Sequence, residues 1–265
     1  MSATSHDEPP ILTTLDAGVL RVQFNRPKAR NAINWEVRRG LRTILDDAAR
    51  DVAVRAVVLA GDDRAFCSGG DVKEMGNGTT DTAAKLTMAK DLGQLIAEME
   101  KPVVAEVRGY ASGAGFGLAM ACDFVLIDDT AIFQSVFIAR GLVPDFGTTY
   151  WLARQVGLHR AKEIILTGRS VMAQEAFDLG IAARLWNAAE FREQADAFVA
   201  SLATAPTFAM GLTKRMLNVT FETDFGAAMD SERLSQLLAS TSQEHLAYLA
   251  SVREAGSARG VLPKP

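Results

Sequence analysis

The sequence predicts an α/β fold with a helical region at its C-terminal end, and three observations lead to this expectation. Short β-branched runs alternate with segments of helical period between residues 19 and 186, which is typical of α/β domains. Two glycine-rich turns each follow one of these runs. From residue 190 onward the pattern is mostly helical.

The chain opens with a predicted strand and a predicted helix. Residues 19–24 alternate in polarity, as a half-buried strand does, and Pro27 ends this strand. Asn34 is a favoured N-cap residue, and we expect a helix from there to about residue 50. Its apolar face consists of Val37, Leu41, Ile44, Leu45 and Ala48.

The next part of the chain runs twice from strand to glycine-rich turn to helix. The ranges are 55–61, 66–71 and 81–100 in the first unit, and 102–107, 109–115 and 115–121 in the second. N–H groups in the first turn of a helix have no partner within that helix, and the helix dipole adds positive charge there. Two such junctions that converge can hold one oxygen that becomes negative during a reaction, which is an oxyanion hole made of main chain.

The remaining elements of the core follow in the same way. Further strands are expected at 123–128 and 182–186, and further helices at 149–156, 160–167 and 173–179. We place a domain boundary near residue 200, so that residues 1–200 form the core and residues 201–265 a helical region.

The helical region carries one apolar stripe at helical spacing. Its members are Leu234, Leu237, Leu238, Leu246 and Leu249. We expect this stripe to pack on a partner subunit, on the region's own core or on both, and the small size of the region favours a partner.

Composition narrows the class of protein. The 265 residues are 48% hydrophobic with a net charge of −4, which argues against a general nucleic-acid binder. The two cysteines, Cys67 and Cys122, and the three scattered histidines predict neither a disulfide scaffold nor a zinc site. Residues 1–10 do not resemble a secretion signal, and no apolar run is long enough to cross a bilayer. We therefore expect a cytoplasmic protein without a metal.

Several motifs, in the order in which they occur, resemble the enoyl-CoA hydratase/isomerase (crotonase) superfamily. The matching stretches are 25–32, 64–75, 101–110, 113–123, 141–144 and 166–168. The resemblance implies a spiral of ββα repeats with a helical C-terminal trimerisation region, and a homotrimer or a dimer of trimers. It also implies an acyl-CoA thioester as substrate. Coenzyme A is then part of the substrate, and no separate cofactor is expected.

The resemblance also implies where the substrate binds. The oxyanion donors align with the backbone N–H groups of Ser68 and Ala114. The residues expected near coenzyme A are Lys28, Arg30, Ala32, Ser68, Gly69, Gly70, Asp71 and Ala114. Arg26, Lys28 and Arg30 form a basic cluster that suits phosphates, although such a run is also typical of an ordinary solvated surface. Lys214 and Arg215 are further candidates for phosphate contacts.

The chain departs from hydratases of this family at both catalytic glutamates. The aligned residues are Gly117 and Phe137, and neither can transfer a proton. Asp145 follows Pro144, as it does in the aspartate-type enoyl-CoA isomerases, which are the closest in motif, and there the aspartate is the base. The alternative role for Asp145 is to cap the helix that starts near residue 148.

These points predict an isomerase that moves a double bond from 3-enoyl-CoA to 2-enoyl-CoA with Asp145 as proton shuttle. Aromatic residues expected around the site, or else in the ordinary core, are Phe116, Phe137, Phe146 and Trp151. Residues 75–95 are expected to form one wall of the acyl pocket. The alternatives are hydratase-like chemistry, hydrolysis, displacement by an aspartate nucleophile, and acyl-CoA binding without catalysis. We expect structural roles for Asp71, Glu106 and Asp123, and a small buried side chain at Cys67.

Overall fold

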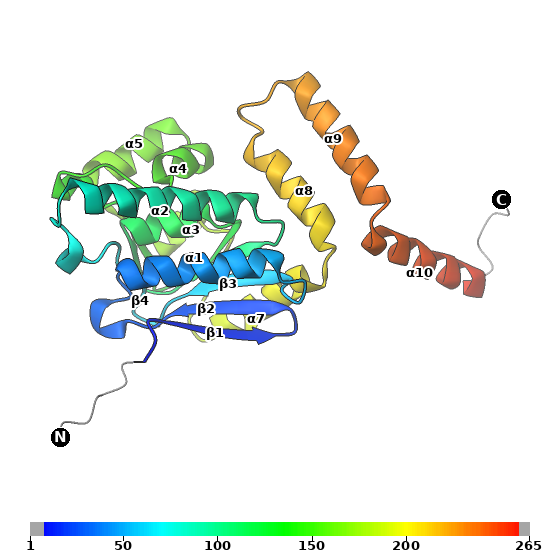
Figure 1. Ribbon diagram of the computed structural model, residues 1–265, viewed down its shortest axis with the longest axis horizontal. Coiled ribbons are helices and arrows are strands. Elements are labelled where there is room, and N and C mark those ends of the chain that lie inside the picture. Colours follow the sequence, from blue (N-terminus) through cyan, green and yellow to red (C-terminus); the bar gives the residue numbers. More distant parts are fainter. Residues whose placement is uncertain (1–7, 260–265) are drawn as a thin grey trace.

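The computed structural model describes residues 8–259, and its core contains a six-stranded and a four-stranded sheet (Figure 1). The six-stranded sheet has the order β1-β2-β3-β5-β7-β10, and only β1 runs antiparallel to its neighbour. Its strands are β1 (Ile11–Asp16), β2 (Val19–Phe24), β3 (Ala56–Ala60), β5 (Val103–Val107), β7 (Phe124–Asp128) and β10 (Arg184–Trp186). All the strands expected from the sequence belong to this sheet.

The four-stranded sheet was not predicted, and neither was β1. Its strands are β4 (Ala65–Cys67), β6 (Tyr110–Ser112), β8 (Ile132–Gln134) and β9 (Ser170–Met172). Each contains three residues, which is too short for an alternating pattern to stand out in the sequence. β1 is mostly exposed on both faces and therefore also lacks the alternation.

Consecutive strands divide between the two sheets, and this produces a repeat. β3 joins the large sheet, β4 joins the small sheet, and helix α2 (Thr79–Glu98) follows; β5, β6 and α3 (Ala114–Ala121) repeat the order. β7 and β8 begin a third unit, which continues into α4 (Thr148–Val156) and α5 (Leu158–Thr167). The expected spiral of ββα repeats is confirmed.

Helix α1 (Trp35–Arg50) begins where the sequence predicts. The side chain of Asn34 accepts a hydrogen bond from the Val37 N–H at 2.9 Å, so Asn34 is the N-cap. Leu41 and Leu45 are fully buried in the main core, which lies between the large sheet and the helices above it in Figure 1. Short helices complete the core: η1 (Pro27–Ala29), η2 (Val72–Glu74), η3 (Ile138–Arg140) and α6 (Ala173–Asp178).

Helix α7 (Phe191–Thr204) covers the other face of the large sheet. Its buried residues Phe191, Ala195 and Val199 share a cluster with Val58 and Val104 of the sheet. The boundary expected near residue 200 therefore falls inside a core helix. We place it after Thr204, where α7 ends, because the apolar face of α7 has its partner in the core.

Three helices follow α7, and the first of them packs on the core, since its Asn218 side chain donates to the Ala97 carbonyl of α2 at 3.0 Å. They are α8 (Thr207–Asn218), α9 (Phe225–Ser240) and α10 (Gln243–Arg259), and α9 and α10 project from the body of the molecule in Figure 1. The predicted leucine stripe is wrong as a single stripe, because α9 ends at Ser240 and α10 begins a new direction. Leu237 is 62% exposed, and Leu234, Leu238 and Leu246 are also exposed.

Residues 1–7 and 260–265 lie outside the described residues. The prediction that residues 1–10 are not a secretion signal therefore falls mostly outside the structure. Within residues 8–259, no single helix is long and apolar enough to cross a membrane, although α7 and α8, bent by 102° at their junction, meet that test together by length and composition.

Candidate active site

The first glycine-rich turn lies between β4 and η2. Asp71 caps η2, since its carboxylate accepts a hydrogen bond from the Lys73 N–H at 3.1 Å. The helix expected at 81–100 is present as α2, but the turn itself leads into the single 3₁₀ turn η2, so the helix-dipole argument does not apply at this junction. The Ser68 N–H donates to the Arg30 carbonyl at 3.0 Å. This corrects the expectation that the Ser68 amide is an oxyanion donor, because its hydrogen is already committed.

Gly70 provides the available amide of this turn. Among the described residues, its N–H has no hydrogen-bond acceptor, and Gly70 lines the large cavity described below. The turn is held by Ile33, whose N–H donates to the Gly69 carbonyl at 2.8 Å and whose carbonyl accepts from Asp71 at 3.1 Å. These two bonds leave the Gly70 N–H between them unpaired.

The second glycine-rich turn connects β6 to α3. Gly113 has φ +53°, a left-handed conformation that favours glycine. Ala114 begins α3, so its N–H is one of the four amides without an intrahelical acceptor. The two turns touch, because a β-carbon on Gly69 would lie 2.9 Å from the Ser112 carbonyl and 3.5 Å from the Ala114 nitrogen. The expected convergence of the turns is confirmed.

A cavity of about 1020 Å³ opens beside both turns. Gly70 and Ala114 line it, together with residues from α1, α2 and the segment from Val136 to Trp151. Residues 75–94 contribute Met75, Leu86, Ala89 and other side chains, so the predicted wall of the pocket is confirmed. The expected aromatic residues Phe137, Phe146 and Trp151 also line the cavity. Phe116 does not, since it is fully buried and packs against Phe133 with ring centroids 5.2 Å apart.

Asp145 lies in this cavity and does not cap a helix. The N-cap of α4 is Gly147, and the Thr148 N–H and hydroxyl donate to the main-chain carbonyl of Asp145 at 3.0 and 2.7 Å. The capping alternative is therefore wrong. The Oδ1 atom of Asp145 is buried without a hydrogen-bond partner. Burial raises the pKa of Asp145 to about 6, and the nearby positive charge of Arg38 partly opposes this rise.

The other carboxylates that line the cavity already have hydrogen-bond or ion-pair partners. Asp71 pairs with Arg26 at 2.8 Å besides capping η2, and Glu74 accepts from the Trp35 N–H at 3.0 Å and lies 3.6 Å from the Lys85 ammonium. Among the described residues that line the cavity, Asp145 is thus the carboxylate without a side-chain or backbone donor from another residue. It is the residue best suited to accept a proton from a ligand.

Packing excludes any side chain at Gly117. A β-carbon there would lie 2.5 Å from the Thr148 hydroxyl, 2.8 Å from the Asp145 carbonyl and 2.8 Å from the Phe146 β-carbon. The segment that carries Asp145 thus occupies the space a glutamate would need. Phe146 has φ +50°, which is uncommon for a residue with a β-carbon and marks a strained turn beside Asp145.

Arg38 also lines the cavity, and reasoning from the sequence missed it. The residue is only 5% exposed, although its side chain is a guanidinium. The signal was present, because Arg38 lies three and seven residues before Leu41 and Leu45 and therefore shares the buried face of α1. A basic residue on the apolar face of a helix indicates a specific role for its charge.

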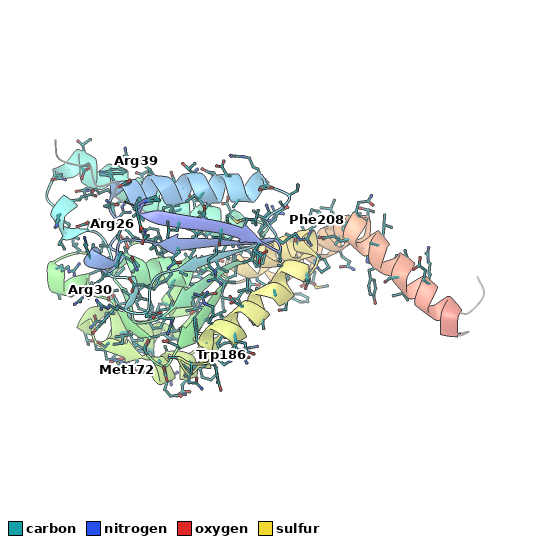
Figure 2. All side chains as sticks on the ribbon, turned by 90° about the horizontal axis from the view of Figure 1, so that it is seen from below. Arg26, Arg30, Arg39, Met172, Trp186 and Phe208 are labelled. Atoms are coloured by element: carbon teal, nitrogen blue, oxygen red, sulfur yellow. The ribbon has the colours of Figure 1, made fainter. Side chains whose placement is uncertain are left out.

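The basic cluster divides into two parts. Arg26 is committed, because it donates to the Ala32 carbonyl and pairs with Asp71. Lys28 and Arg30 are exposed, and Figure 2 shows Arg26 and Arg30 at the same end of the molecule. Their loop lies against the first glycine turn, since the Ser68 hydroxyl donates to the Ala29 carbonyl at 3.2 Å.

The remaining candidates have structural roles. Lys214 pairs with Asp123 at 2.7 Å, and Asp123 also accepts from the Val103 N–H at 2.7 Å. Lys214 is therefore a structural cation and not a free phosphate ligand, whereas the tethering role predicted for Asp123 is confirmed. Arg215 lies 3.2 Å from Glu100 on the surface.

Two further predictions are confirmed. Glu106 pairs with Arg21 at 2.6 Å and with Arg192 at 3.2 Å, which is a structural role. Cys67 is fully buried, and burial raises the pKa of its thiol to about 12, so the thiolate needed for nucleophilic attack is not formed at neutral pH.

Known proteins resemble this chain over nearly its whole length. Residues 14–250 match the family model described as enoyl-CoA hydratase/isomerase. The chain is 32% identical over 240 residues to the 1,2-epoxyphenylacetyl-CoA isomerase of Escherichia coli, covering 89% of this chain and 92% of that protein. It is 29% identical to the 4-chlorobenzoyl coenzyme A dehalogenase-1 of an Arthrobacter species, covering 87% and 85%. An enoyl-CoA hydratase structure from Mycobacterium smegmatis superposes with a TM-score of 0.87 at 29% identity, covering 94% and 97%.

Proposed function

The chain belongs to the enoyl-CoA hydratase/isomerase family, and from this premise we propose that it isomerises 3-enoyl-CoA thioesters to 2-enoyl-CoA thioesters. Family membership supports an acyl-CoA-processing enzyme. The single observation that favours isomerisation is the solitary carboxylate of Asp145, which lines the cavity without a donor from another residue.

The two glycine turns supply the oxyanion hole in this proposal. The thioester oxygen accepts hydrogen bonds from the N–H groups of Gly70 and Ala114, with Gly70 taking the role first expected of Ser68. Loss of a proton from C2 moves negative charge onto that oxygen. Donors that are already in place stabilise the charge at no cost of reorganisation, and each is worth about 10²–10³ in rate.

Asp145 carries the proton in the proposed reaction. Its ionised carboxylate removes a proton from C2 of the 3-enoyl thioester, and the electrons spread into a dienolate. The double bond then re-forms between C2 and C3 as the carboxylic acid returns the same proton to C4. No proton is gained or lost overall, so one group suffices. A carboxyl pKa of about 6 suits it to both steps near neutral pH.

Hydration is less favoured, because it needs a positioned water and a second group to transfer protons. Phe137 stands at one position where hydratases carry a glutamate, and packing leaves no room for a side chain at the other, Gly117. Phe137, Phe146 and Trp151 give the cavity apolar walls, which keep water away from the dienolate.

A second candidate is displacement with Asp145 as nucleophile. The similarity to a chlorobenzoyl-CoA dehalogenase and the unpartnered Oδ1 atom favour it. The carboxylate would attack a ring carbon and expel halide, and water would then cleave the resulting ester. Haloaryl thioesters in the substrate panel distinguish this reaction, since isomerisation releases no halide.

The test compares Asp145→Asn with the wild type in D₂O, using hex-3-enoyl-CoA. We expect the variant to lose C2 deuterium exchange and product formation by about 10²–10⁴-fold, while its affinity for the thioester stays within about threefold. Asp129→Asn is the matched control, because Asp129 is exposed and does not line the cavity. Undiminished exchange in Asp145→Asn refutes the mechanism. Binding without exchange in the wild type supports a non-catalytic protein, and release of free coenzyme A supports hydrolysis.

We extend the proposal to the thioester's carrier and to assembly. Lys28 and Arg30 are exposed beside the first glycine turn and offer charge to the phosphates of coenzyme A.

Exposed leucines on α9 and α10 favour burial in a homotrimer or a dimer of trimers. Light scattering that gives the mass of one chain contradicts this assembly. The cytoplasmic location stays a prediction.

A further inference from the structure

Arg38 is a buried cation whose hydrogen-bonding capacity is mostly unused. Its side chain is 5% exposed, and a guanidinium has five N–H donors. Within residues 8–259 the one hydrogen bond of its side chain is from Nη1 to the Lys85 carbonyl at 3.3 Å, and its Nε is buried without a partner. Leaving such donors unsatisfied away from water is costly, so an acceptor supplied by a ligand would stabilise this site.

The position of Arg38 places its donors beside the proposed reacting groups. A β-carbon on Gly70 would lie 3.9 Å from its Nη2 atom, and its guanidinium carbon lies 5.9 Å from the centroid of the Phe146 ring, next to Asp145. The residue lines the same cavity as the two proposed oxyanion donors. Leu41 and Leu45 anchor this face of α1 in the core, so the helix holds the guanidinium in place.

We propose that Arg38 binds a neutral oxygen atom on the acyl group, close to the reacting carbons. The substrate class is then an oxygenated 3-enoyl-CoA, bearing a hydroxyl, oxo or epoxide oxygen, in preference to a plain hydrocarbon chain. This inference rests on the proposed function, because Arg38 lies between Gly70, a proposed oxyanion donor, and Phe146, the neighbour of Asp145, so its free donors face the part of the cavity in which the reacting acyl carbons would bind.

Charge counting favours a neutral oxygen over a carboxylate. Asp145 must be ionised to take the C2 proton, and burial already raises its pKa to about 6. A second anion on Arg38 would cancel the positive charge that opposes this rise, so the pKa of Asp145 would rise further and less of the base would be ionised. Lys85 cannot replace that charge, because it is paired with Asp81 at 2.7 Å. The other cations of the cavity, Lys90 and Arg140, are exposed to water.

The competing explanation is that Arg38 only adjusts Asp145 or supports the fold. In that case an Arg38 substitution changes the turnover of every substrate by the same factor. A role in substrate recognition instead changes the ratio between two substrates that differ in the oxygen alone. The ratio is therefore the decisive measurement.

The experiment uses two thioesters of nearly equal shape, 5-hydroxyhex-3-enoyl-CoA and 5-methylhex-3-enoyl-CoA. We expect the wild type to prefer the hydroxyl compound by about tenfold or more in kcat/KM, as a hydrogen bond to a charged donor implies. Arg38→Met should bring the ratio to about one, and Arg38→Lys should keep part of it. Arg39→Met is the control, because Arg39 is exposed on the same helix and does not line the cavity (Figure 2); it should keep the wild-type ratio.

A binding measurement separates this inference from the proposed function. The saturated analogues 5-hydroxyhexanoyl-CoA and 5-methylhexanoyl-CoA cannot isomerise, so calorimetry with the wild type reports recognition alone. A preference for the hydroxyl analogue without turnover of either alkene supports the Arg38 site and refutes the isomerase. Turnover of both alkenes with equal kcat/KM, together with equal affinity for the two saturated analogues, supports the isomerase and refutes the Arg38 site. A stronger, Arg38-dependent preference for hex-3-enedioyl-CoA, which ends in a carboxylate, overturns the neutral oxygen.

Discussion

Replacing Asp145 by asparagine should inactivate the protein and at the same time stabilise its fold near neutral pH. The two effects have one cause, which is the burial of a carboxylate beside the cavity without a donor from another residue. Burial makes the charge available to substrate and also makes the charge costly for the folded state. Asparagine keeps the shape of the side chain and removes the charge.

The size of the expected change in stability follows from the pKa of Asp145. Its ordinary value is 3.8, and in the folded protein it is about 6. Between these values the folded state binds more protons than the unfolded state, so the free energy of unfolding falls as pH rises from about 4 to 6 and is level above that. A shift of about two units corresponds to about 3 kcal/mol at pH 7.5. Burial of the asparagine amide offsets part of this gain, and we expect Asp145→Asn to be stabilised by about 2 kcal/mol.

The assay is urea unfolding of the wild type and Asp145→Asn at pH 4 and pH 7.5, with equal protein concentrations because assembly affects apparent stability. The variant should exceed the wild type at pH 7.5, and the difference should shrink to a few tenths of a kcal/mol at pH 4. Asp129→Asn, on the surface, should show no such change. If the free energies of unfolding of the wild type and Asp145→Asn differ by the same amount at pH 4 and pH 7.5, the reasoning is refuted.

Two further predictions follow from the same segment. Gly117→Ala should lose about 1–3 kcal/mol of stability and most activity, because the added β-carbon would lie 2.8 Å from the Asp145 carbonyl oxygen and would displace that segment. Urea unfolding and steady-state assays check this, and a stable, active variant contradicts it. The kcat/KM of the wild type should rise about tenfold per pH unit below pH 6 and level off above it, as Asp145 ionises; a flat profile between pH 4.5 and 7 removes Asp145 as the base.

Local pattern was sufficient for five strands of the large sheet, all but β1, and for the helices that pack on it. Val19–Phe24 and Ala56–Ala60 carry β-branched residues in runs long enough to recognise, and Asn34 caps the helix that it was expected to cap. The three-residue strands of the second sheet had no such signal. Their pairing depends on residues that are distant in the sequence, such as Ala111 beside Phe133.

The order of motifs along the chain was not enough to predict the details of the site. Ser68 and Gly70 lie in one short turn, and only the position of Arg30 decides which of their N–H groups is already bonded. Whether Asp145 caps a helix or stays free depends on where α4 begins, and the left-handed residues Phe146 and Gly147 separate Asp145 from that start, with Gly147 as the N-cap. Arg38 gains its significance from neighbours more than 30 residues away.

The sequence by itself determined the family, the ββα core and the absence of a proton-transferring side chain at positions 117 and 137, because these depend on residue type and on order along the chain. The tertiary structure alone decided which amides remain unpaired, which carboxylate faces the cavity without a partner, and that a buried arginine lies beside it. Hydrogen bonds and burial are properties of groups brought together from distant parts of the chain, and no local pattern records them.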